Sequence, residues 1–101
     1  MVRQEIVSDI ETRLVVSGPL YGEAGVEFER KIDSLSESPY RTITLDFSMA
    51  VGITSSAIAK LVFIQKRLSA QGRSVRIIGC SDVLYGIFTK IRLDTLIEIT
   101  K

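Results

Sequence analysis

The chain has 101 residues, of which 46% are hydrophobic, 25% charged and 7% aromatic. This composition is typical of one globular domain over residues 1–101 and excludes a disordered, collagen-like or multidomain chain. Lys and Arg number 13 and Asp and Glu number 12, and the resulting net charge of +1 lacks the basic excess of nucleic-acid-binding proteins. No apolar stretch approaches the about 20 residues of a membrane helix, and charges are spread over residues 1–20, where a signal peptide would be apolar. We expect a cytoplasmic protein that neither binds nucleic acid nor inserts into a membrane.

The residues that are missing exclude most enzyme chemistry. The chain has no histidine and a single cysteine, Cys80, so Ser–His and Cys–His nucleophile pairs and Cys/His zinc sites are ruled out. Glycines never fall in the spacing of a dinucleotide-binding or P-loop motif. We therefore predict no enzyme, no cofactor and no metal, with only a carboxylate magnesium site still conceivable. Cys80 follows the apolar run Val75–Ile78, which favours a buried, reduced thiol.

Two short strands are predicted at the start of the chain. Residues Glu5–Val7 and Glu11–Ser17 carry apolar and β-branched side chains, and the second stretch alternates. Residues 8–9, Ser-Asp, suit the turn between them. Residues 18–19, Gly-Pro, are expected to end the second strand, because proline has no N–H for continued pairing.

An amphipathic helix is predicted over Tyr21–Leu35. Its apolar residues recur every three or four positions, and acidic residues fill its first half, which suits the helix dipole. The apolar positions are Ala24, Phe28, Ile32 and Leu35.

A central strand and a second helix follow. Thr42–Phe47 alternates as a strand, and Met49–Ile53 is expected to be a loop of small residues. Hydroxyl residues at 54–56 begin a helical pattern that continues to Gln71, and Gly72 suits its C-terminal end.

The last elements complete an alternating order. Ser74–Gly79 is predicted to be a strand, Ser81 to be the N-cap of a helix ending near Ile91, and Thr95–Ile99 to be a final strand. The order β-β-α-β-α-β-α-β predicts an α/β fold with a mixed, mostly parallel sheet and helices packed on it. The residues of the last helix expected to point inward are Leu84, Ile87, Phe88 and Ile91.

The central helix has two apolar stripes. When successive residues are placed 100° apart around the helix axis, the apolar side chains fall on two arcs. The first arc is expected to face the sheet, and the second points in another direction. Either a neighbouring helix covers Phe63, or its arc is a docking surface with a basic rim. Taken alone, the basic residues are more typical of a solvated helix face. The first arc contains Ala57, Leu61, Ile64 and Leu68; the second contains Ser56, Ala59, Phe63 and Ala70; the rim consists of Lys60, Lys66 and Arg67.

The hydroxyl cluster Thr54-Ser55-Ser56 has two interpretations. Any of the three can cap the free N–H groups of the helix start. Three hydroxyls exceed that need, and a phosphate on one of them would lie at the positive end of the helix dipole.

The stretch LDFSMAVGITSSAIAKLVFIQKRLSAQGRSVRIIG, Leu45–Gly79, resembles the core of STAS domains, which are named for sulfate transporters and anti-sigma factor antagonists. The strand end LDFS, the Ser-Ser pair opening a helix, the helix end KRLSAQG and the strand SVRIIG stand in the family's order. VSGPLYGEAG upstream and IFTKIRLDTLIEI downstream extend the resemblance over essentially the whole chain.

The resemblance implies a bacterial partner-switching protein. Its unmodified form would bind an anti-sigma factor with serine-kinase activity, phosphorylation would abolish binding, and a serine phosphatase would reset it. In the family's Asp-Ser-x-Gly string, Ser55 matches the phosphoacceptor, with Thr54 and Ser56 as alternatives. Thr54 replaces the family's aspartate, and Ala57 replaces its glycine. Asp46 matches the acid at the family's strand end and is expected to support the loop.

The predicted partner-binding residues combine this resemblance with the second arc. The departures at positions 54 and 57 also favour an alternative, a phosphorylation-independent scaffold in a signalling assembly or an accessory subunit of a membrane transport complex. Self-association and small-ligand binding stay open. The expected contacts to a partner are Ser56, Ala59, Lys60, Phe63 and Lys66.

Overall fold

Five strands alternate with three α-helices in the computed structural model, which describes residues 1–101. This order confirms the predicted α/β class and the β-β-α-β-α-β-α-β succession. The elements are β1 (Val2–Ile6), β2 (Glu11–Leu20), α1 (Gly22–Ser36), β3 (Thr42–Ile53), α2 (Ser55–Ser69), β4 (Ser74–Ile78), α3 (Asp82–Lys90), the 3-10 turn η1 (Leu93–Thr95) and β5 (Glu98–Ile99).

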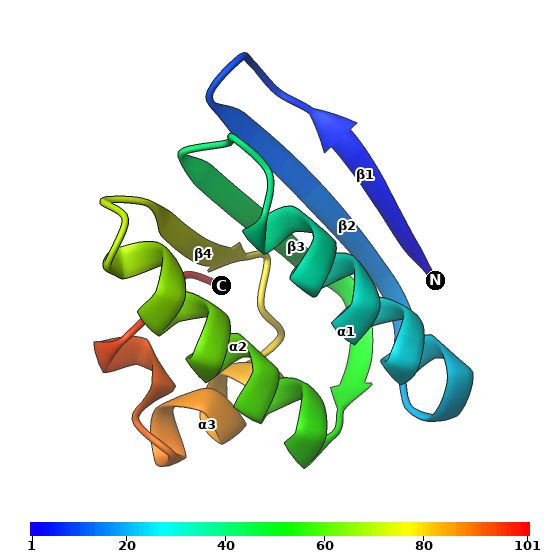
Figure 1. Cartoon of the computed structure of the whole chain (residues 1–101). Helices are drawn as coiled ribbons and strands as arrows, with labels where there is room; N and C mark the ends of the chain where they lie inside the picture. The colour runs from blue at the N-terminus through cyan, green and yellow to red at the C-terminus, as the bar shows by residue number, and fades with distance from the viewer.

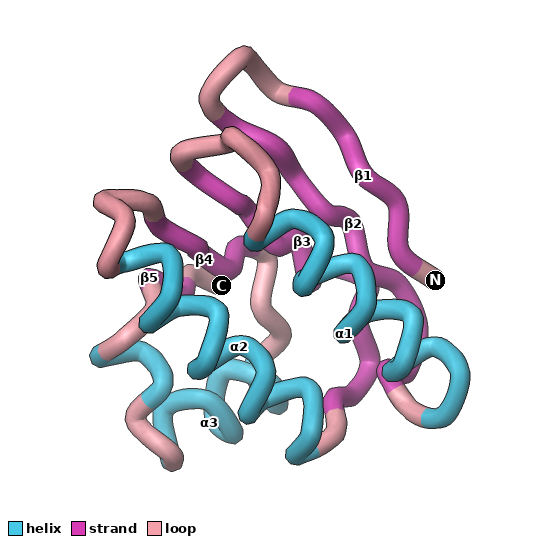
Figure 2. Tube along the Cα trace, viewed as in Figure 1, coloured by secondary structure: helices cyan, strands magenta, loops and turns pink.

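The strands form one sheet in the order β1-β2-β3-β4-β5, which is also their order in the chain. β1 is antiparallel to β2, and every other pair is parallel, so the sheet is mixed and mostly parallel as predicted. α1 and α2 lie side by side across one face of the sheet, and α3 lies beyond α2 (Figure 1). Figure 2 shows β1 at the margin of the sheet with no strand outside it.

β2 and β3 are longer than the sequence predicts. β2 does not end at Gly18-Pro19 but continues to Leu20, and the expected loop Met49–Ile53 is the second half of β3. Two register shifts in the β2–β3 pairing mark bulges, each with one extra residue in β3. The second shift falls between Gly18 and Pro19, and at such an interruption of the ladder a strand tolerates a residue without N–H. β4 pairs only as far as Asp46 of β3, so the last part of β3 extends beyond the sheet beside β2 alone.

The core lies between the sheet and the helices. Phe28 of α1, Phe47 of β3 and Phe88 of α3 are fully buried and form a row across it. Ring centroids are 6.0 Å apart for Phe28 and Phe47 and 6.1 Å for Phe47 and Phe88, the spacing of favourable edge-on and tilted pairs. Burial of Cys80 in the same core is confirmed, and the desolvation raises the pKa of its thiol.

The C-terminal part of the chain differs most from the prediction. Leu84 and Phe88 point inward as expected, but Ile87 and Ile91 are exposed, so that part of the prediction is wrong. The chain turns at Arg92, which has a left-handed backbone with φ 63°, and Leu93 enters the core directly afterwards. The short β5 replaces the longer strand expected, and β1 lies further toward the N-terminus than the predicted Glu5–Val7.

The sheet face opposite the helices carries charged side chains. Thr44 is fully buried there because Glu11 and Arg76 cover it. The Thr44 hydroxyl donates to Glu11 Oε2 at 2.9 Å, and the Arg76 Nε donates to the same hydroxyl at 3.0 Å. The bond from Thr44, with the Arg76 guanidinium 3.2 Å away, outweighs desolvation and holds the pKa of Glu11 below its usual value.

Candidate functional site

The start of α2 lies directly after the extended end of β3 (Figure 1), and it contacts the middle of α1 at Glu29. Thr54, Ser55 and Ser56 therefore stand where one strand ends and a helix begins. Thr54 has an extended backbone and is the N-cap, and its Oγ1 accepts a hydrogen bond from the N–H of Ala57 at 3.2 Å. Ala57 itself is fully buried, so the residue at the position of the family's glycine points into the core.

The three hydroxyl groups have different surroundings. Thr54 is engaged in the cap, and the Ser56 hydroxyl donates to Glu29 Oε2 of α1 at 3.0 Å. Ser55 is exposed, and its hydroxyl makes no hydrogen bond with the protein. Ser55 is thus the one hydroxyl of the cluster that is accessible and not used by the fold.

The two arcs of α2 separate as the periodicity predicts. Ala57, Leu61, Ile64 and Leu68 are all buried in the core. Phe63 is 60% exposed, so the interpretation that a neighbouring helix covers it is wrong. We call the exposed residues Ser55, Ala59, Phe63 and Lys66 the α2 outer face.

Two of the expected contact residues, Ser56 and Lys60, bond to side chains of α1. Lys60 Nζ donates to Asp33 Oδ2 at 2.9 Å and is only 27% exposed, and Ser56 bonds Glu29 one turn earlier. Arg67 lies at the same side, 3.9 Å from Glu37. These contacts join the two helices and leave Lys60 half-buried, whereas Ser56 stays exposed with its hydroxyl bonded to α1.

Asp46, expected in a loop-supporting role, lies within β3 and makes a local hydrogen bond. Its Oδ1 accepts a hydrogen bond from the N–H of Ser48 at 2.9 Å, inside the first bulge of β3. Gly79 at the end of β4 approaches the same bulge, and a Cβ built on it would lie 2.9 Å from Ser48 Cβ. Asp46 and Gly79 together therefore fix the path of β3 on its way to Ser55.

Exposed apolar side chains near the start of α2 were not predicted. Met49 and Val51 on the extended part of β3 are 57% and 70% exposed, and Tyr21 before α1 is 55% exposed. The Tyr21 hydroxyl lies against Gly52, where any side chain would collide with it. Alternation of Met49, Val51 and Ile53 was the available signal, but the small residues between them favoured a loop.

The arrangement suits recognition of a partner. No group of three or more Cys, Asp or Glu side chains gathers where a metal ion would be held. None of the helices is both long and apolar enough to cross a membrane. What the site offers is an exposed aromatic ring, a free serine at a helix N-terminus and a surface of apolar side chains on two elements.

A sheet with an antiparallel first strand, covered by helices on one face, and a serine at the start of the central helix define the class of α/β regulatory domain that the sequence resembles. Comparison with family models agrees, because the model described as "STAS domain" matches residues 2–101. The chain belongs to the STAS domain family. Sequence comparison with curated proteins finds no match.

Solved structures share the whole fold. The unphosphorylated form of the anti-sigma factor antagonist SpoIIAA is similar with a TM-score of 0.83 at 17% identity, covering 100% of this chain and 89% of that one. The phosphorylated form of SpoIIAA from Bacillus gives a TM-score of 0.77 at 17% identity, covering 100% and 92%. A sulfate transporter family protein from Wolinella succinogenes gives 0.75 at 17% identity, covering 95% and 80%. The fold is therefore that of the anti-sigma factor antagonists and also of transporter STAS domains.

Proposed function

We propose that this protein is an anti-sigma factor antagonist that works as a partner switch. Its unmodified α2 outer face binds an anti-sigma factor with serine-kinase activity, and phosphorylation of Ser55 by that kinase ends the binding. A serine phosphatase restores the unmodified form. The proposal is for a cytoplasmic regulator of transcription in a bacterium, acting through protein–protein contact and without enzymatic activity of its own.

The observation that carries the assignment to Ser55 is that the other two hydroxyls, of Thr54 and Ser56, are hydrogen-bonded within the protein and that of Ser55 is not. A kinase needs an accessible hydroxyl whose modification leaves the fold intact. Phosphorylating Thr54 would disturb the cap at Ala57, and phosphorylating Ser56 would bring a phosphate against the Glu29 carboxylate 3.0 Å away. Ser55 has neither constraint, and the first-turn N–H groups of α2 can donate hydrogen bonds to a phosphate.

The α2 outer face supports a switch driven by charge. Ser55 and Phe63 are eight residues apart, which is about 12 Å along a helix, and Ala59 lies between them. A phosphate adds about −1.5 to −2 charges, and a partner that buries Phe63 would then have to desolvate this charge as well. A buried aromatic of this kind is typical of the residues that contribute most to an interface.

The first test is intact-mass spectrometry of the protein isolated from its native cells, with fragmentation to locate any phosphate. We expect a species heavier by about 80 Da, modified on Ser55, in one of two conditions, growing or stressed. Phosphate on Thr54 or Ser56 would contradict the assignment of the residue. Its absence under both conditions would contradict the switch.

Binding is tested with the anti-sigma factor kinases of the source organism, purified singly. Ser55→Ala should bind one of them as the wild type does and resist phosphorylation, whereas Ser55→Asp should lose binding. Phe63→Glu should also lose binding, and Lys90→Glu, an exposed site at the end of α3, is the control for a change of charge. Equal binding by wild type and Ser55→Asp would overturn the proposal.

A second candidate function is a phosphorylation-independent module, either a scaffold or the accessory subunit of a transport complex. It is supported by the likeness to transporter STAS domains, by Thr54 in place of the family's aspartate, and by Ala57 in place of its glycine. In that case Phe63→Glu should weaken assembly, and both Ser55→Ala and Ser55→Asp should leave it unchanged.

A further inference from the structure

β1 is an edge strand whose outer backbone groups face away from the sheet. Met1 exchanges two hydrogen bonds with Ser17, both of 2.9 Å, and the Val7 N–H donates to the Glu11 carbonyl at 3.1 Å. In an antiparallel ladder these pairs occur at every second residue, so odd-numbered residues of β1 bond to β2. The N–H and C=O groups of Val2, Gln4 and Ile6 therefore point outward.

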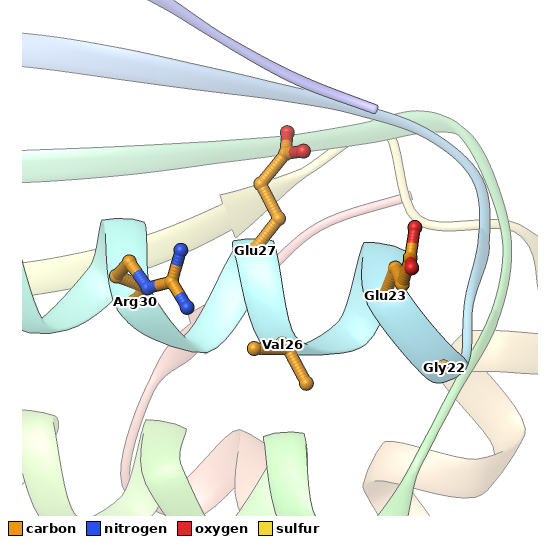
Figure 3. A pocket seen from close by; sticks show the side chains of 5 residues that line it. All are labelled: Gly22, Glu23, Val26, Glu27 and Arg30. Carbon is orange, nitrogen blue, oxygen red and sulfur yellow. The ribbon is translucent and has the colours of Figure 1, made fainter.

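This edge carries few of the devices that normally block pairing with another chain, and its two charged side chains, Arg3 and Glu5, have opposite signs. β1 has five residues, without proline or lysine, and its register with β2 has no bulge. The start of the edge is protected by α1, because Glu27 Oε1 accepts a hydrogen bond from the outward N–H of Val2 at 3.2 Å. Figure 3 shows the Glu27 side chain extending from α1 toward β1. The outward groups of Gln4 and Ile6 have no such cover.

The sequence of β1, VRQEI, is complementary to itself when reversed. An antiparallel pair centred on Gln4 places Val2 opposite Ile6 and Arg3 opposite Glu5, twice over by symmetry. This register joins even-numbered residues with even-numbered residues, which are the ones whose backbone groups point outward. The opposite charges, the apolar pairs and the direction of the free backbone groups thus all favour the same register.

Exposure on both faces of β1 agrees with this pairing. Ile6 is 72% exposed, whereas Val2, two pleats away on the same face, packs against the core. In the symmetric pair the Ile6 side chain of each copy lies beside Val2 of the other and loses contact with water. On the opposite face Arg3 Nη2 and Glu5 Oε2 form an ion pair of 3.0 Å within one copy, and because the two side chains are 66% and 42% exposed, they can exchange partners across the new strand pair.

We propose that β1 pairs antiparallel with β1 of a second copy of this chain, about a twofold axis at Gln4, which joins the two five-stranded sheets into one. The Ile6 carbonyl of each copy takes the place of Glu27 at the Val2 N–H of the other. α1 lies between β1 and α2, so the α2 outer face remains free in the dimer (Figure 1). The dimer is therefore independent of the proposed partner switch.

The test is sedimentation velocity over a range of protein concentrations, with two matched variants at the centre of the strand. Gln4→Ala and Gln4→Pro both remove the side-chain bond from Gln4 Nε2 to Thr12, but only proline removes the outward N–H. Gln4→Ala should dimerise like the wild type. Gln4→Pro should raise the dissociation constant about 25-fold, because two symmetric hydrogen bonds are lost at about fivefold each.

Charge exchange tests the register. Arg3→Glu alone and Glu5→Arg alone each place like charges opposite one another in the homodimer, and both should be monomeric. An equimolar mixture of these two variants restores opposite charges at both positions, and it should form a heterodimer. Lys90→Glu should leave the dimer unchanged, since it lies on α3.

Three results would overturn the proposal. They are a wild type that stays monomeric at the highest soluble concentration, a dissociation constant that Gln4→Pro leaves unchanged, and a failure of the two charge variants to associate when mixed. Loss of Ser55 phosphorylation or of partner binding with the dimer intact would overturn only the partner switch. Amide hydrogen exchange adds a direct readout, because Gln4 and Ile6 should become protected as the protein concentration rises.

Discussion

Removing the three hydroxyls at the start of α2 one at a time should separate the structural residue from the functional one. Thr54→Ala deletes the cap that accepts from the Ala57 N–H, and loss of such a cap costs about 1 kcal/mol. For a domain of about 100 residues this lowers the thermal midpoint by about 4–8 °C. Ser55→Ala deletes a hydroxyl with no partner in the protein and should change the free energy of unfolding by less than about 0.5 kcal/mol.

Urea unfolding followed by far-UV circular dichroism measures both variants under one set of conditions. Equal slopes against urea concentration would establish that the unfolded states are comparable, so the midpoints can be compared directly. Ser56→Ala is the intermediate case, because it loses only an exposed bond to Glu29, and it should cost about 0.5 kcal/mol. If Ser55→Ala lowered the free energy of unfolding as much as Thr54→Ala does, the hydroxyl of Ser55 would also stabilise the fold, and the reason for selecting Ser55 would be refuted.

Two further predictions concern the sheet. The pKa of Glu11 is lowered mainly by its bond from Thr44, so its contribution to stability is complete above its unfolded-state pKa and is lost as the pH falls through the lower folded-state value. Glu11→Gln should therefore be less stable than the wild type near pH 7, with a difference that shrinks in acid; a difference independent of pH would contradict this. Gly79→Ala should cost about 2 kcal/mol or more, since φ is +67° and the new Cβ meets Ser48 Cβ at 2.9 Å. Gly86→Ala, in a helix and with no atom within 4 Å of the new Cβ, is the control and should be neutral or stabilising in the same unfolding assay.

The fold was largely predictable because hydrophobic periodicity and capping agree along most of the chain. Ser81 caps α3 as predicted, with its Oγ accepting from the Leu84 N–H at 3.2 Å, and Gly72 follows α2 with a left-handed backbone. The prediction was wrong where tertiary pairing outweighs local preference. Gly18 and Pro19 remain in β2 because bulges accommodate them and β3 pairs alongside.

The candidate site was predictable in part. The angular separation of Phe63 from the core arc follows from helix geometry alone, and the structure confirms its exposure. The roles of the three hydroxyls could not be assigned from sequence, since each of them is able to cap. The pairing of Lys60 with Asp33 and of Ser56 with Glu29 depends on how α1 and α2 lie against each other, which periodicity within one helix does not contain.

The strands have the same order in the sheet as in the chain, and this has a consequence for folding. Every strand pairs with the one before it in the sequence, so each new pairing closes only the loop or helix that has just been formed. Contacts between near segments lower the entropy cost of loop closure and favour rapid folding. During synthesis the β1–β2 hairpin can form first, α1 and β3 can add to it, and α2 with β4 can follow. The sheet thus grows from the N-terminal edge in the direction in which the ribosome delivers the chain.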